Sequence, residues 1–157
     1  MVLSVILLVL CGCSKLEKAT PIIENISCTA EIEYNHSKYV CDLESFKDGL
    51  NLTVVEPKEI AGIKFIIKNN KVTTEYKGIS DAPELNELPQ HLITRIVFDV
   101  INDVKGKEIE FDKFNGVINE EVEGYKYGFV FSPAGLPISL SIEDIDLEIY
   151  FKDISLK

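Results

Sequence analysis

The sequence is short of positive charge, and this deficit limits what the protein can bind. Lysine and arginine together number 16 against 26 aspartate and glutamate residues, which gives a formal net charge of −10 at pH 7. A surface of that sign repels nucleic-acid backbones and anionic lipid headgroups. Acidic and basic residues are interspersed along the chain, so no charged tail is evident. We therefore expect no nucleic-acid partner.

Motifs of the common enzyme classes are also missing. The chain has only two histidines, His36 and His91, and neither has a partner at a spacing typical of a catalytic or metal site. It contains no HExxH motif, no GxSxG turn and no glycine-rich phosphate loop. The acidic residues between Glu143 and Glu148 divide between a predicted turn and the outward face of a strand, which favours a solvated edge over a calcium site. We expect no catalytic residues, metal or cofactor.

The apolar run at the start of the sequence is too short to remain as a membrane-spanning helix. Met1–Leu10 (MVLSVILLVL) has ten residues, whereas a bilayer needs about 20. A run of this length is typical of the core of a signal peptide. The residues that follow, Leu10-Cys11-Gly12-Cys13, resemble the lipobox of bacterial lipoproteins, in which a leucine, a small residue and a glycine precede the modified cysteine.

This resemblance implies that Cys13 receives a diacylglyceryl group on its thiol and becomes the first residue of the mature protein. Two acyl chains are what stable anchoring needs. The implied organisation is a signal peptide over residues 1–12 and a lipidated tether over residues 13–25, with the protein anchored to the cell membrane on its extracytoplasmic side. An ordinary signal peptide or a short anchor is the alternative interpretation of the same residues.

Residues 86–106 (NELPQHLITRIVFDVINDVKG) are the long segment with helical periodicity. Asn86 can cap this helix, Pro89 suits its first turn and Gly106 suits a left-handed residue after its end. The alternation over residues 92–100 also permits a strand, but the periodic run is longer than an ordinary strand. Apolar side chains on one half of the helical wheel are Leu92, Ile93, Ile96, Val97, Val100, Ile101 and Val104.

Most of the remaining chain alternates apolar and polar residues at the period of β-strands, and we predict about eight or nine antiparallel strands. In the first hairpin we expect Ile32 opposite Cys41, with the turn near His36-Ser37. In the second hairpin, the turn at Asn69-Asn70 pairs Lys68 with Lys71. Each strand then has one apolar face.

The candidate ligand-binding residues lie on the predicted strand that begins at Tyr125 and on the predicted helix. Tyr125, Tyr127, Phe129 and Phe131 recur at every second position, and the returning strand is expected to place Ile138 opposite Phe129. This aromatic stripe is either packed core or, with the helix, the wall of a cavity. Phe98 lies outside the apolar half of the helix and is either covered by a loop or lines a pocket.

Two cysteines, Cys28 and Cys41, lie on neighbouring predicted strands of a domain that we expect to be exported, a setting that favours a disulfide. The expected register, however, places Cys28 opposite Ser45 and Cys41 opposite Ile32. Their Cα atoms are then too far apart to bridge. We predict two buried free thiols.

One helix cannot cover a flat sheet of eight or nine strands, so we predict an α+β fold in which a curved antiparallel sheet wraps around one long central helix as a half-barrel. Strands, a central helix and further strands, in this order, are similar to the LolA/LolB group, with its RseB-like, LppX-like and clostridial germination lipoprotein relatives. The stretches that fit are Tyr39-Val40-Cys41, Glu56-Pro57, Ala61-Gly62-Ile63-Lys64-Phe65 and Glu75-Tyr76-Lys77-Gly78.

The resemblance implies a single LolA-like domain over residues 26–157, whose concave face takes acyl chains or a protein partner. Two functions follow from it. The first is a membrane-anchored, non-catalytic lipoprotein that binds a lipid or acyl chain among Phe98 and the aromatic stripe. The second is an interaction module that supports another exported protein through a sheet edge or rim. No residues support an enzymatic function.

Overall fold

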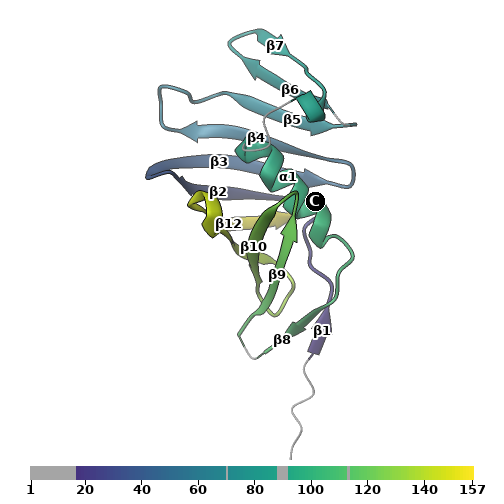
Figure 1. Ribbon diagram of the computed structural model, residues 1–157. Helices are drawn as coiled ribbons and strands as arrows, with labels where there is room; N and C mark the ends of the chain where they lie inside the picture. Colours follow the sequence, from purple (N-terminus) through teal and green to yellow (C-terminus); the bar gives the residue numbers. More distant parts are fainter. Residues whose placement is uncertain (1–16, 70, 88–91, 113) are drawn as a thin grey trace, which may run out of the picture.

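A computed structural model describes residues 17–69, 71–87, 92–112 and 114–157. These residues form 12 strands in one sheet, one α-helix (α1) and two short 3₁₀ turns (Figure 1). The elements are β1 (Glu17–Ala19), β2 (Ile26–Tyr34), β3 (Ser37–Phe46), β4 (Gly49–Glu56), β5 (Lys64–Lys68), β6 (Lys71–Tyr76), β7 (Ile79–Asp81), η1 (Leu85–Glu87), α1 (Ile93–Val104), β8 (Ile109–Phe111), β9 (Gly116–Val122), β10 (Tyr125–Phe131), β11 (Pro137–Ile142), η2 (Glu143–Ile145) and β12 (Leu147–Leu156).

The sheet consists of two meanders that meet in its middle. Strands β2 to β7 follow one another as neighbours, as do β8 to β12, and β12 pairs with β2 to join the halves. In the described part of the chain, β1 and β7 each have one neighbouring strand, so the sheet is open. The helix α1 connects the halves and lies across the sheet (Figure 1). The predicted antiparallel sheet with a single helix is confirmed, with more strands than the eight or nine expected.

The predicted helix is present but shorter than expected. It begins at Ile93, after Leu92 as N-cap, and no side chain caps it. The expectation that Asn86 caps it is wrong, because Asn86 lies in the separate turn η1; Pro89 and His91 fall outside the described residues. Gly106 has the predicted left-handed conformation, with φ 74°. Since the helix is rich in β-branched residues, its stability depends on packing of its buried face.

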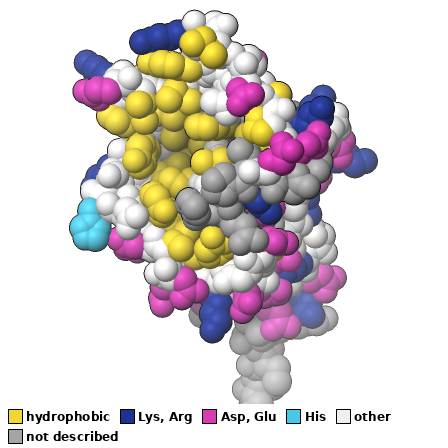
Figure 2. All heavy atoms as spheres, turned by 45° about the horizontal axis from the view of Figure 1, so that its top comes forward, with side chains coloured by type: hydrophobic (Ala, Val, Ile, Leu, Met, Phe, Trp, Pro, Cys, Tyr) yellow, Lys and Arg dark blue, Asp and Glu magenta, His cyan; other side chains and the backbone are white. Residues whose placement is uncertain are grey.

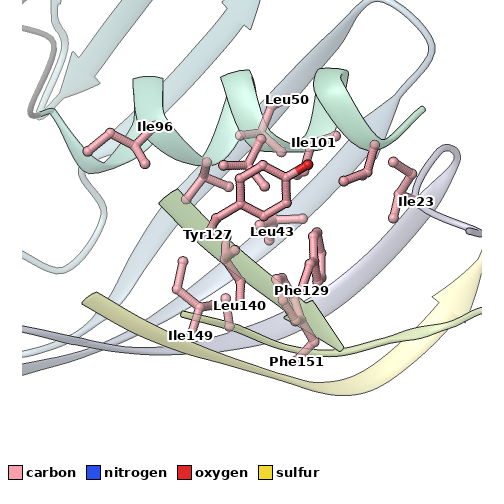
Figure 3. Packing of buried hydrophobic residues seen from close by; sticks show 14 of the residues in the cluster. Ile23, Leu43, Leu50, Ile96, Ile101, Tyr127, Phe129, Leu140, Ile149 and Phe151 are labelled. Carbon is pink, nitrogen blue, oxygen red and sulfur yellow. The ribbon is translucent and has the colours of Figure 1, made fainter. Parts of the chain in front are cut away.

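That buried face contacts the sheet as the sequence predicts. In Figure 3, Ile96 and Ile101 of α1 lie over Leu43 and Tyr127 from the strands. All of the predicted helix residues from Ile96 onward are buried, and Thr94, which the wheel did not select, is buried with them. The core therefore lies between the helix and the concave side of the sheet.

The register of the first hairpin differs from the prediction by two residues. Ile32 pairs with Tyr39 rather than with Cys41. The turn lies at Asn35-His36, both with positive φ (48° and 66°), one residue earlier than expected. Two residues with positive φ are typical of the tight turn that suits twisted strands. Because the shift is an even number, the buried face is unchanged. The second hairpin has the predicted pairing of Lys68 with Lys71.

The β10–β11 hairpin contains an irregularity that the alternation did not indicate. Val130 pairs with Ser139, but Phe131 pairs with Pro137, so Ile138 is an extra residue in the ladder. This bulge turns Ile138 outward, where it is 40% exposed. The predicted pairing of Phe129 with Ile138 is therefore wrong, and Phe129 pairs with Leu140.

Residues 17–25 belong to the fold, although the sequence suggested a tether through residue 25. Glu17–Ala19 pairs with β8, and the side chain of Ile23 is buried. The Ile22 amide donates to the Gly135 carbonyl at 2.7 Å. The predicted start of the domain at residue 26 is thus too late. The predicted signal peptide, residues 1–12, and the predicted lipidation site Cys13 lie outside the described residues.

Candidate functional site

Three residues of the predicted cavity wall are packed core. Tyr127, Phe129 and Phe131 are buried, and Figure 3 shows Tyr127 and Phe129 beneath α1. The ring centroid of Phe129 lies 4.3 Å from that of Phe131 and 5.6 Å from that of Phe151, where the rings stack. Such close aromatic contacts leave no room for a ligand between these rings.

The other two predicted residues, Phe98 and Tyr125, are partly buried against the same core. None of the five predicted aromatic residues lines the apolar groove described below. Tyr127 instead contributes to an open polar pocket of about 460 Å³ with Glu120 and Glu121, which Glu143 and Asp144 also line. The aromatic stripe and Phe98 are thus not brought together around one apolar cavity.

An apolar groove lies elsewhere, between the first turn of α1 and strands β3 to β5. Its volume is about 200 Å³. Figure 2 shows a hollow of apolar side chains on this side of the molecule. The residues that line it are the buried Ile32, Cys41, Leu52, Val54 and Thr94 and the partly exposed Tyr39, Ile60, Ile63, Phe65, Leu92 and Ile93.

The loop between β4 and β5 forms one side of the groove because it folds back onto β4. The Gly62 amide donates to the Val54 carbonyl at 2.8 Å, and the Val54 amide donates to the Ile63 carbonyl at 2.9 Å. Gly62 has φ 88°, a conformation that L side chains rarely adopt. These hydrogen bonds keep the loop against β4, so that Ile60 and Ile63 line the groove. Sequence alternation could not predict this loop.

One lining residue, Thr94, presents a polar group in these apolar surroundings. Its side chain is 2% exposed, and its Oγ1 has no hydrogen-bond partner among the described residues. A buried hydroxyl without a partner destabilises a folded protein by about 1–3 kcal/mol. Thr94 is therefore an exception to the rule that buried polar groups are satisfied.

The two cysteines are buried free thiols, as predicted. Cys28 pairs with Leu43 and Cys41 with Ala30, so the predicted partners were wrong while the conclusion holds. Burial, with a smaller effect of the Asp42 carboxylate, raises the pKa of Cys28 to about 12 and that of Cys41 to about 11. Neither thiol is activated as a nucleophile.

A charged cluster fixes the other end of α1. The Tyr127 hydroxyl donates to Asp103 Oδ2 at 2.5 Å, and Lys107 Nζ lies 2.7 Å from the same oxygen and 2.6 Å from Glu120 Oε2. Burial raises the pKa of Asp103, but the hydrogen bonds from Lys107 and Tyr127 outweigh it and hold that pKa below its usual value. The cluster joins α1 to β9 and β10.

The histidines and the acidic side chains are the remaining residues that the sequence analysis considered. His36 is exposed beside Asp146, with Nδ1 and Oδ2 3.2 Å apart, and His91 lies outside the described residues. In the part of the chain that the structure describes, no three His, Cys, Asp or Glu side chains are placed to share a metal ion. No described helix is both long enough and apolar enough to cross a membrane.

These features define an open α+β half-barrel with an apolar groove beside its helix. Among solved structures, the chain is similar to a LolA superfamily protein from Nitrosomonas europaea, with a TM-score of 0.46 and 10% sequence identity over 84% of each chain. At this identity the likeness concerns the fold alone. No family model matches the sequence, and neither does any curated protein.

Proposed function

We propose that the protein is a membrane-anchored, non-catalytic binding protein that holds part of an acyl chain in the groove between α1 and strands β3–β5. The groove is the observation that supports the proposal, because it is apolar and open to solvent in the folded chain. Lipid on Cys13 supplies the anchor, as the lipobox resemblance implies.

The size of the groove limits what it can hold. Pockets that enclose a whole small ligand measure about 300–1,000 Å³, whereas this groove measures about 200 Å³. A water molecule takes up roughly 30 Å³ in the liquid, and a methylene group is of similar size, so about six or seven methylenes fit. Their transfer from water contributes roughly 5 kcal/mol before the entropy of association is subtracted. We therefore expect weak, exchangeable binding of a chain segment.

The proposal is tested by titrating the protein with dodecanoate carrying a ¹³C-labelled methyl group and following that signal by NMR. Ile63→Glu places a carboxylate at the groove and should weaken binding by at least tenfold. Ile79→Glu is the matched control, because Ile79 lies on β7, outside the groove, and is 75% exposed. Equal binding by the two variants and the wild type would show that the groove is not the binding site.

The second candidate function is recognition of another exported protein. The observation that favours it is the same small volume, which suits one or two side chains of a partner better than a whole lipid. Co-precipitation from envelope extracts should then recover a specific protein with the wild type and with Ile79→Glu but not with Ile63→Glu. Dodecanoate binding without such a protein favours the first function.

A further inference from the structure

The connection between β8 and β9 carries an aromatic side chain that is largely exposed to solvent. Phe114 is 79% exposed, more than any other large apolar residue that the structure describes. A single exposed apolar residue is ordinary on a protein surface. Its position relative to the proposed lipid anchor is what makes this one informative.

One carboxylate, that of Asp112, accepts hydrogen bonds from the backbone next to Phe114. Asp112 Oδ1 accepts the amides of Phe114 at 2.7 Å and Asn115 at 2.8 Å, and the Asp112 amide donates to the Asn115 carbonyl at 3.0 Å. The first two bonds hold the pKa of Asp112 below its usual value. Asp112 therefore fixes the backbone of Phe114 and Asn115 next to the start of β9.

Strand pairing fixes the side of the molecule on which the turn lies. β1 and β8 are antiparallel, with Glu17 opposite Phe111. The chain that continues from Phe111 into the turn therefore leaves the sheet at the same end as the chain that precedes Glu17. Figure 1 shows β1 and β8 together at the lower end of the molecule.

A lipid on Cys13, as the proposed function has it, would be tethered to this end of the sheet. Cys13 precedes Glu17 by four positions, and four residues span at most about 13–14 Å. Phe114 follows Phe111 by three positions. Acyl chains on Cys13 therefore bring the bilayer surface within reach of the turn.

We propose that Phe114 inserts its ring into the interface of the bilayer to which Cys13 is anchored. Aromatic rings favour the headgroup region of membranes. The neighbouring carboxylates of Glu108, Glu110 and Asp112 are exposed. Lys18 Nζ lies 3.9 Å from Glu108 and 3.5 Å from Glu110, so one positive charge offsets part of this negative charge. The negative charge that remains suits zwitterionic rather than anionic headgroups. Two acyl chains and one ring together limit the orientations that the protein can adopt on the membrane. This inference rests on the anchoring in the proposed function.

The absence of tryptophan from the sequence allows a direct test. Full-length Phe114→Trp, produced with its lipid and placed in phosphatidylcholine vesicles, has one emitting indole. We expect its emission to shift to the blue and to fall at least twofold when the acyl chains are brominated. Ile79→Trp, at a site that is also exposed but on β7 at the opposite edge of the sheet, should show neither change.

The outcomes separate this inference from the proposed function. The mass of the mature chain shows first whether Cys13 carries a diacylglyceryl group, and an unmodified Cys13 overturns both the anchor and the role of Phe114. A lipidated protein in which Phe114→Trp is quenched no more than Ile79→Trp overturns the Phe114 inference alone. Quenching that weakens when phosphatidylglycerol replaces part of the phosphatidylcholine supports the preference for zwitterionic headgroups.

Discussion

Replacing Thr94 by valine should make the protein more stable, although the residue is in the core. Valine has nearly the shape of threonine, and it removes the hydroxyl that has no hydrogen-bond partner in the described part of the chain. An unsatisfied buried hydroxyl destabilises by about 1–3 kcal/mol, and valine and threonine have similar helix propensities. We expect a gain of about 1–2 kcal/mol in the free energy of unfolding. For a chain of 157 residues this corresponds to roughly 2–8 °C in Tm.

Urea denaturation followed by circular dichroism measures this gain, with Thr94→Ser as the matched control. Serine keeps the hydroxyl and loses one methyl group from the core, so it should destabilise by about 1 kcal/mol. The slope of the unfolding free energy against urea should be the same for all three proteins, because the exposed surface is the same. A loss of stability in Thr94→Val would show that the hydroxyl has a partner and would refute the reasoning.

Three further predictions concern the charged cluster, β9 and the thiols. Tyr127→Phe should lower the unfolding free energy by about 1.5–3 kcal/mol at pH 7, because it removes a hydrogen bond to the Asp103 carboxylate. The pKa of Asp103 in the folded protein lies below its usual value of 3.8. The difference in stability from wild type should therefore be complete above pH 3.8 and disappear as the pH falls through the folded-state pKa of Asp103. Gly116→Ala should destabilise by at least about 1 kcal/mol in the same assay, since its Cβ would lie 2.6 Å from a β8 side chain. Iodoacetamide at pH 8 should not alkylate Cys28 or Cys41 in the native protein, because both thiols are buried. In urea without reductant it should alkylate both. Peptide mass spectra in which neither cysteine is alkylated in urea would indicate a disulfide.

The fold was predictable where the pattern of burial is simple. The helix face from Ile96 to Val104 and the Lys68–Lys71 hairpin follow from periodicity and turn chemistry alone. The register of the first hairpin differs from the prediction by two residues. The predicted buried face is nevertheless correct, because side chains alternate between the two faces of a strand at every residue. Short strands such as β1 were missed because three residues carry too little pattern, and their position depends on pairing with β8.

The candidate site was much less predictable than the fold. The aromatic stripe was identified correctly as apolar, yet Phe129 and Phe131 fill the core instead of lining a cavity. The groove depends on Ile60 and Ile63, which a loop brings back onto β4 through backbone hydrogen bonds. It also depends on the helix beginning only at Ile93. Neither feature leaves a periodic signal in the sequence.

The strand order also sets the distance between the groove and the β1 edge of the sheet. In that order β3 to β5 lie seven to nine positions from β1, which is about 35–45 Å measured along the curved sheet at roughly 4.8 Å for each strand. If lipid on Cys13 holds the β1 edge at a membrane, as we propose, the groove would lie away from the headgroups, by at most this distance. An acyl chain would then have to leave the leaflet before it could enter the groove, and ligand exchange would take place in the aqueous space.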